Sequence, residues 1–148
     1  MVVTEDVKAG VIWAGTTAPY SDLIEAWKRW RAGRPTATPD PERSEPRGLE
    51  EMFETYGTPE EAPAFWAAMS PLSYLGDLSG PLQLHHGTAD DSVPVAFSQN
   101  LYVQLAERDE RSELYIYQGD NHNLSNNFGT AMQRSVQFFD RYVKQIER

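Results

Sequence analysis

Two short polar segments carry the residues of this chain that could perform acid–base chemistry. The first, HHGTADDSVP, contains His85, His86 and the doublet of Asp90 and Asp91; the second, GDNHN, begins about thirty residues later and contains His122. A carboxylate that is hydrogen-bonded to an imidazole fixes the tautomer of the ring and stabilises the imidazolium. The imidazole can then take a proton from a nucleophilic hydroxyl. The sequence therefore predicts the acid and the base of a nucleophilic triad.

Each of these segments follows a predicted strand. Pro81–His86 (PLQLHH) is the expected strand before the aspartate loop. Glu113–Tyr117 (ELYIY) alternates apolar residues at a period of two and precedes the loop at Gly119–Gly129. Ligands bind at the carboxyl ends of parallel strands, and neighbouring strands lie only ~4.8 Å apart. We therefore expect Asp90 and His122 to meet across two adjacent strand ends.

The rest of the chain alternates strand-like and helix-like segments, which is typical of an α/β protein with parallel strands. Val7–Ala14 (VKAGVIWA) is apolar almost throughout, as expected of a strand covered on both faces. Thr58 and Glu61 predict a capping box for a helix that starts at Pro59. The expected helices are Ser21–Arg31, Leu49–Tyr56, Pro59–Met69, Pro94–Glu107 and an amphipathic Thr130–Ile146, in which Met132, Val136, Phe139, Val143 and Ile146 are spaced by three or four residues.

Composition excludes several classes of protein. The chain has 148 residues, the size of one ordinary domain, and 40% of them are hydrophobic. Its net charge of −9 makes it a poor candidate for binding nucleic acid or an anionic membrane. No stretch reaches the ~18 apolar residues of a membrane span, and the first residues lack signal-peptide features, so the cytoplasm is the default compartment. With no cysteine, disulfides, thiol catalysis and Cys-ligated zinc are excluded.

A proline-rich, acidic excursion interrupts the α/β pattern. Four prolines between residues 32 and 48 predict an exposed loop or linker. Residues 40–61 hold eight acidic side chains against two arginines, so −6 of the net charge lies in this stretch. We interpret that charge as a solvated face.

Taken together, these motifs resemble the C-terminal part of an α/β-hydrolase catalytic domain. HGTADD with the downstream DNH, the upstream SPLSYL and the closing FFDRYV are most similar to the prolyl oligopeptidase family of serine peptidases. Dienelactone-hydrolase-like esterases are close cousins. The resemblance covers residues 7–14 and 70–146 well and residues 19–69 poorly. It implies one partial domain with about three parallel strands and flanking helices: residues 1–31 give a strand and a helix, 32–69 a loop and cap-like helices, and 70–148 the Asp/His region.

The resemblance also assigns roles to the polar residues. It places the catalytic acid on Asp90, the catalytic histidine on His122 and a loop-shaping histidine on His86. Asp90 has an alternative as a turn or cap residue. Asp91 is the second candidate for the acid, and His85 is interpreted as structural.

The same residues offer a metal site as an alternative. Imidazole and carboxylate groups from His85, His86, His122, Asp90 and Asp120 are competent zinc ligands. Adjacent histidines on a strand point to opposite faces, however, so they do not easily converge on one ion. We therefore expect no metal and no cofactor.

The nucleophile of the family is missing. A serine hydrolase of this fold carries its serine in a G-x-S-x-G turn between a strand and a helix. The chain has no such motif, and Ser79 in GDLSG has the wrong spacing and precedes a strand. In the family, the strand matching Val7–Ala14 follows the helix of the nucleophile, so we expect the serine and the oxyanion donors to come from a preceding segment.

Three hypotheses follow from the missing serine. The chain is the C-terminal segment of a peptidase that cleaves peptide bonds through an acyl-enzyme, or of a related esterase, and is inactive alone. Alternatively it is a non-catalytic remnant whose open first strand pairs with a second copy of itself, because a bare strand edge is a template for association. In the third, Ser79 or Ser125 has been recruited to His122.

Overall fold

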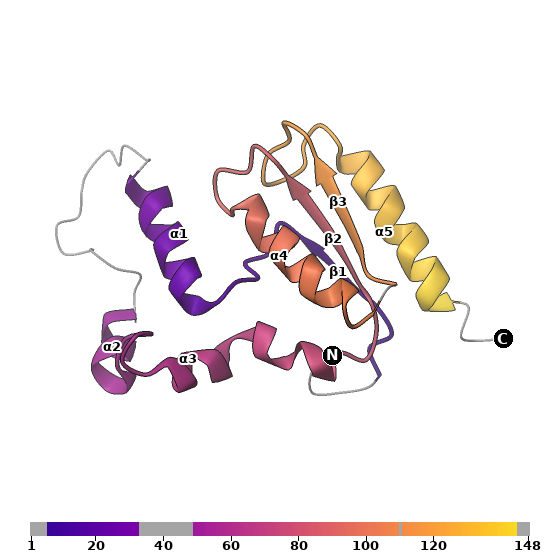
Figure 1. Ribbon diagram of the computed structural model, residues 1–148. Coiled ribbons are helices and arrows are strands. Elements are labelled where there is room, and N and C mark those ends of the chain that lie inside the picture. The colour runs from indigo at the N-terminus through magenta and orange to yellow at the C-terminus, as the bar shows by residue number, and fades with distance from the viewer. Residues whose placement is uncertain (1–5, 33–48, 110, 145–148) are drawn as a thin grey trace. The chain divides into compact units, whose positions relative to one another are not determined.

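The computed structural model describes residues 6–32, 49–109 and 111–144 (Figure 1). Within it the chain forms two compact units, Met1–Ala18 with Tyr74–Arg148, and Pro19–Ser73. The first unit holds the predicted strands and the second holds the helices of the excursion. Of the expected loop at residues 32–48, Ala32 is the last residue of a helix, and residues 33–48 lie outside the described residues.

A parallel three-stranded sheet is the centre of the first unit, in the order β1-β2-β3. The strands are β1 (Gly10–Trp13), β2 (Leu82–Gly87) and β3 (Glu113–Tyr117). Every residue of β2 is buried, whereas all four residues of β1 are half-buried. The predicted parallel α/β arrangement is confirmed. The first strand is shorter than the expected Val7–Ala14. It begins at Gly10 and ends before Ala14, whose φ of 46° turns the chain out of the extended conformation.

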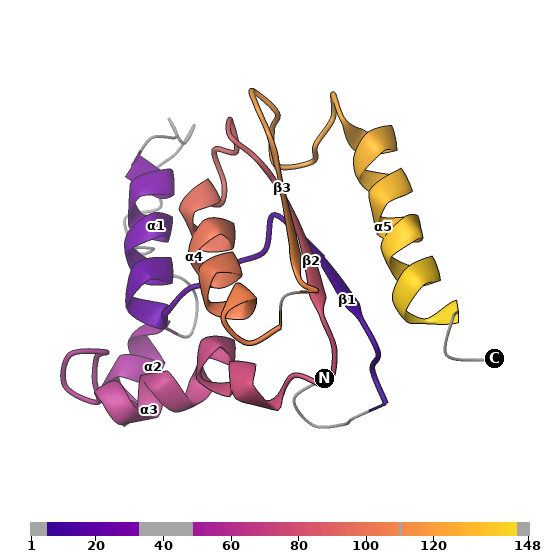
Figure 2. The same ribbon diagram turned by 45° about the vertical axis from the view of Figure 1, so that its right-hand side comes forward.

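Two helices cover opposite faces of this sheet. Figure 2 shows α4 (Val95–Ala106) on one side and α5 (Phe128–Tyr142) on the other. The helix α4 begins one residue after the expected Pro94, which stands at its N-cap, and ends one residue before the expected Glu107. The helix α5 begins two residues before the expected Thr130.

Most of the large apolar residues of α5 do not face the sheet. Its buried residues are Ala131, Ser135 and Phe138. The side chains that form what we call the α5 stripe are between 39% and 53% exposed: Phe128, Met132, Val136, Phe139 and Val143. The predicted spacing is present from Met132 to Val143, and Ile146 lies outside the described residues. It marks a surface that stays partly exposed, although Phe128 at one end contacts Trp13 of β1.

The second unit contains three helices, α1 (Tyr20–Ala32), α2 (Leu49–Tyr56) and α3 (Pro63–Met69). Both hydrogen bonds of the predicted capping box form between Thr58 and Glu61, at 2.9 and 3.4 Å, yet they close a turn and not a helix. The helix starts at Pro63, so the expected start at Pro59 is wrong: a second proline takes the first helical position. Trp66 is the buried centre of this unit and donates to the Gly57 carbonyl at 3.0 Å.

A short 3-10 segment (Pro71–Asp77) precedes β2. None of the helices in the described part of the chain is long and apolar enough to span a membrane.

Candidate active site

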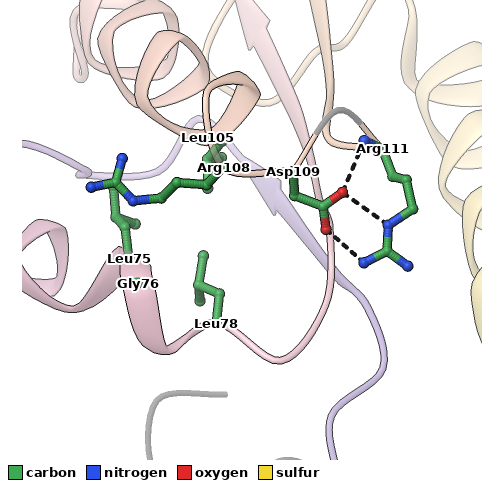
Figure 3. A pocket seen from close by; sticks show the side chains of 7 residues that line it. All are labelled: Leu75, Gly76, Leu78, Leu105, Arg108, Asp109 and Arg111. Carbon is green, nitrogen blue, oxygen red and sulfur yellow. Dashed lines mark hydrogen bonds and ion pairs between the residues drawn. The ribbon is translucent and has the colours of Figure 1, made fainter.

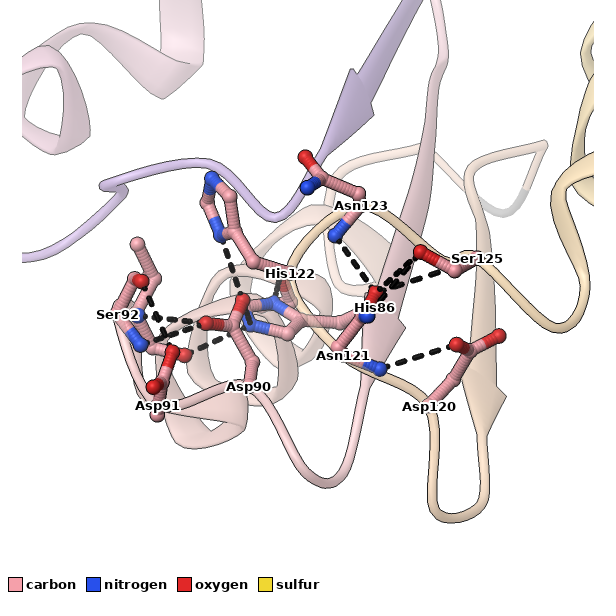
Figure 4. Close-up of polar contacts among 11 residues, drawn as sticks. His86, Asp90, Asp91, Ser92, Asp120, Asn121, His122, Asn123 and Ser125 are labelled. Atoms are coloured by element: carbon pink, nitrogen blue, oxygen red, sulfur yellow. Dashed lines mark hydrogen bonds and ion pairs between the residues drawn. The ribbon is translucent and has the colours of Figure 1, made fainter.

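The carboxyl ends of β2 and β3 bring the two predicted polar loops together. His122 Nδ1 lies 2.8 Å from Asp90 Oδ2, although the two residues are 32 positions apart in the chain (Figure 4). The pair that the sequence predicted is therefore assembled at the end of the sheet where ligands bind in open α/β folds.

Asp90 is held in one orientation by its own turn. Its Oδ1 accepts hydrogen bonds from the backbone N–H groups of Ser92 at 2.8 Å and Val93 at 2.9 Å, and its side chain is fully buried. Burial raises the pKa of the Asp90 carboxyl, but the hydrogen bonds from Val93, His122 and Ser92 outweigh it and hold the pKa below its ordinary value. Asp90 is therefore ionised at neutral pH.

The ring of His122 has one nitrogen toward Asp90 and the other directed away from it (Figure 4). Because the carboxylate can only accept, the proton of neutral His122 lies on Nδ1. Its Nε2 then carries a lone pair. The side chain is 42% exposed. This arrangement leaves a nitrogen that could accept a proton, on a ring whose tautomer is fixed by the carboxylate behind it.

His86 supports the aspartate turn from the α4 side of the sheet. Its buried ring lies 3.0 Å from the Val93 carbonyl and 3.1 Å from Asp90 Oδ2, both through Nε2, so this nitrogen carries a proton. The other nitrogen is 2.7 Å from Ser98 Oγ. Asp91 is exposed and accepts from the Ser92 hydroxyl, so Asp90 is the member of the doublet that pairs with His122.

The two loops are joined by backbone contacts. The N–H of Thr88 donates to the Tyr117 carbonyl at 3.0 Å, and the Thr88 hydroxyl accepts from the Gly119 N–H at 2.8 Å. The Ala89 N–H donates to the Asp120 carbonyl at 2.9 Å. A Cβ on Gly87 would lie 2.2 Å from that same carbonyl oxygen, so this close approach requires glycine. These contacts set the distance between the acid and the base.

Asp120 builds the histidine loop, a role that the sequence analysis missed. Its buried carboxylate accepts from the backbone N–H groups of Asn121, Asn126 and Asn127 and from the Asn127 amide, at 2.9–3.1 Å. Burial raises the pKa of Asp120, but these hydrogen bonds outweigh it and lower the pKa. An aspartate followed by a run of asparagines was the available signal, because such residues bond to the backbone of their own turn.

His85 and His86 point to opposite faces of β2, as predicted. The partners of His86 come from α4 and the aspartate turn, whereas His85 contacts Tyr117 of β3 and Ser135 of α5. Across the described residues, no three His, Cys, Asp or Glu side chains are grouped so that they could hold a metal ion.

The two candidate internal serines do not contact His122. Ser79 lies at the opposite end of the sheet, where its hydroxyl donates to the Val7 carbonyl at 2.6 Å. Ser125 is exposed and bonds to Asn121 at 3.1 Å. Neither hydroxyl is placed to give its proton to the ring.

A cavity of about 510 Å³ opens at the amino ends of β2 and β3 (Figure 3). Its walls are Leu75, Gly76, Leu78, Leu105, Arg108, Asp109 and Arg111. Arg111 is neutralised by a two-pronged ion pair with Asp109 at 2.7 and 2.8 Å. Because this cavity lies at the end of the sheet opposite to His122, it is not the substrate pocket of that histidine.

The sheet, its flanking helices and the Asp/His pair define the C-terminal part of an α/β-hydrolase. Residues 19–145 match the model of the prolyl oligopeptidase family, and the chain belongs to that family. The match includes residues 19–69, where the resemblance of the sequence was poor.

A curated relative and two solved structures agree with this assignment. The uncharacterized peptidase YuxL of Bacillus subtilis is 32% identical over 56 residues, which is 38% of this chain and 8% of YuxL. A puromycin-hydrolyzing peptidase of Mycobacterium tuberculosis has a TM-score of 0.65 at 16% identity, over 96% of this chain and 19% of that one. An esterase of Pyrococcus furiosus has a TM-score of 0.57 at 16% identity, over 93% of this chain and 45% of that one. The chain thus spans less than half the length of each, and the two structural likenesses concern the fold.

Proposed function

We propose that this chain supplies the general base and the orienting acid of a serine peptidase. The observation that carries the proposal is the 2.8 Å contact between His122 Nδ1 and the ionised, buried Asp90, which directs the lone pair of His122 Nε2 outward. This is the arrangement that activates a hydroxyl nucleophile.

In the proposed reaction His122 Nε2 takes the proton from a serine hydroxyl while the serine oxygen bonds to the substrate carbonyl carbon. His122 then gives this proton to the leaving amine as the C–N bond breaks, which leaves an acyl-enzyme. Water attacks the ester of the acyl-enzyme by the same route, and the serine regains its proton. Asp90 stays ionised throughout and stabilises the imidazolium, because its hydrogen bonds lower its pKa.

The serine and the oxyanion donors come from a segment outside these 148 residues. In the described sheet β1 is an edge strand, and Trp13 at its end touches Phe128 of the α5 stripe, with ring centroids 5.5 Å apart. The strand edge and the apolar stripe therefore adjoin. We propose that a strand of the nucleophile-bearing segment pairs along β1 and that a helix of the same segment covers the stripe.

The proposed substrate is a peptide. An ester is the second candidate, favoured by the likeness of the fold to the Pyrococcus furiosus esterase. Peptide and ester substrates with the same acyl group distinguish the two, because an esterase does not cleave the amide at a comparable rate.

The first test is to read the coding sequence on the 5′ side of the Met1 codon and to express any longer in-frame product that contains G-x-S-x-G. We expect a fluorophosphonate probe to label its serine, and the label to be lost in His122→Ala but kept in Asn123→Ala, the exposed neighbour. Labelling that survives His122→Ala overturns the proposed base. A short native protein that forms dimers through β1 favours the non-catalytic alternative.

A further inference from the structure

A buried chain of polar groups lies on the α5 face of the sheet, opposite to α4. His85 is fully buried, with Nδ1 2.9 Å from the Tyr117 hydroxyl and Nε2 2.6 Å from Gln83 Oε1. Arg134 of α5 donates to the same Tyr117 hydroxyl at 3.2 Å. Gln83 Nε2 donates to the Glu113 carboxylate at 2.8 Å.

The two ends of this chain fix the direction of every hydrogen bond in it. A guanidinium can only donate and a carboxylate can only accept, so the bonds run from Arg134 through Tyr117, His85 and Gln83 to Glu113. His85 must accept at Nδ1 and donate from Nε2, which is the neutral ring. A second proton on Nδ1 would face a hydroxyl that already accepts from Arg134, and the hydroxyl hydrogen of Tyr117 would lose its acceptor.

The remaining surroundings of His85 also disfavour its cation. Burial, and after it the Arg134 charge, lower the pKa of His85 from 6.5 to about 4, although the Glu113 charge opposes them. The ring is flanked by Tyr115 and Trp13, each with its centroid 5.4 Å away. The other titratable group against it from β3 is Tyr117, and from α5 it faces Arg134 and the neutral Ser135 hydroxyl at 3.3 Å.

These hydrogen-bonded polar groups join β3 to α5, the two elements that anchor the His122 loop. Tyr117 is the last residue of β3, and the loop that follows ends where α5 begins. Leu124, two positions after His122, is fully buried in a cluster with Tyr117 and Ala131 of α5. The loop therefore keeps its shape only while α5 stays against the end of β3.

We propose that neutral His85 is a positioning residue for His122. It holds α5 against β3, and a proton on its ring releases α5 together with the loop that carries His122. The consequence for catalysis rests on the proposed function of His122, whereas the release of α5 does not.

The test is amide hydrogen exchange of the 148-residue chain at pH 7 and pH 5, corrected for the intrinsic dependence of exchange on pH. A histidine pKa lowered from 6.5 to about 4 predicts that the opening equilibrium of α5 rises about 20-fold between these pH values. We expect the amides of α5 and of Leu124 to lose this protection together while those of α4 lose little. Equal loss in α4 and α5, or no loss in α5, overturns the proposal.

Two variants separate this role from general stability. In His85→Phe the dependence of α5 on pH disappears. If this variant does not fold, Arg134→Gln serves, because losing the nearby cation eases protonation of His85 and makes the rise smaller. Arg108→Gln, at an exposed arginine outside the chain of polar groups, keeps the full effect. An unchanged rise in Arg134→Gln contradicts the proposal, and a serine nucleophile plays no part in any of these outcomes.

Discussion

Replacing Asp90 by asparagine tests the geometry of the acid–base pair without changing the size of the side chain. Asp90 Oδ1 accepts two backbone N–H groups, so the amide oxygen of an asparagine must take that position. Its NH2 group then faces His122 Nδ1 in place of the carboxylate oxygen now 2.8 Å away. Two donors cannot share this contact. We therefore expect His122 to move its proton from Nδ1 to Nε2 in Asp90→Asn.

The expected cost follows from the same contacts. A hydrogen bond to a charged group contributes ~1.5–3 kcal/mol. His122 is 42% exposed, so solvent screening places the loss in unfolding free energy at the low end, about 1–2 kcal/mol. The effect on catalysis is larger: with its lone pair toward the introduced amide and its proton outward, His122 cannot act as a base. A serine enzyme assembled with this variant should therefore lose roughly 10³- to 10⁴-fold in kcat.

Long-range ¹H–¹⁵N correlation spectra at pH 8.5 measure the tautomer directly. The chain has three histidines, so few ring signals have to be assigned. We expect the protonated nitrogen of His122 to be Nδ1 in the unmodified chain and Nε2 in Asp90→Asn. The matched control is Asp91→Asn, at the exposed neighbour, which should leave His122 unchanged. The reasoning is refuted if His122 keeps its Nδ1 proton in Asp90→Asn, or if Asp91→Asn is the variant that moves it.

Three further predictions concern stability. Gly87→Ala should lower the unfolding free energy by about 2–4 kcal/mol, since its Cβ would lie 2.2 Å from a backbone oxygen of Asp120. Gly129→Ala, in open space on α5, should raise the unfolding free energy by about 0.5–1 kcal/mol. Urea denaturation measures both, and equal effects would contradict the packing argument. Asp120→Asn should lower Tm and raise exchange at the Asn127 amide, because an amide NH2 would face backbone donors; an unchanged Tm would mean that the carboxylate does not build the loop. The pKa of His85 is lowered from 6.5 to about 4, so the contribution of neutral His85 to stability is complete above pH 6.5 and is lost as the pH falls toward 4. Unfolding free energies from urea titrations should drop by at most about 3 kcal/mol over that range. The drop should be absent in His85→Phe.

The sheet and the acid–base pair were accessible from the sequence because their signals are local. An apolar run before each polar loop is enough to predict a buried parallel strand, and parallel strands necessarily bring their following loops to one edge. The resemblance then selected Asp90 over Asp91, and the structure pairs Asp90 with His122.

Features that depend on tertiary contacts were missed or placed wrongly. The capping-box hydrogen bonds at Thr58 form, yet the helix begins only at Pro63. Local capping hydrogen bonds do not decide whether a turn continues as a helix. Spacing alone could not tell which side of α5 faces the sheet, since small residues such as Ala131 pack closer than Val136. The role of Asp120 depends on a loop conformation that no periodic pattern encodes.

The most direct test of the account is the reaction of the folded 148-residue chain with a fluorophosphonate, followed by intact mass. If the base and the acid lie in this chain and the serine lies in another segment, a sample whose His122 carries its proton on Nδ1 gives no adduct. A stoichiometric adduct that His122→Ala abolishes would show that a working serine lies within these residues, and would contradict the account.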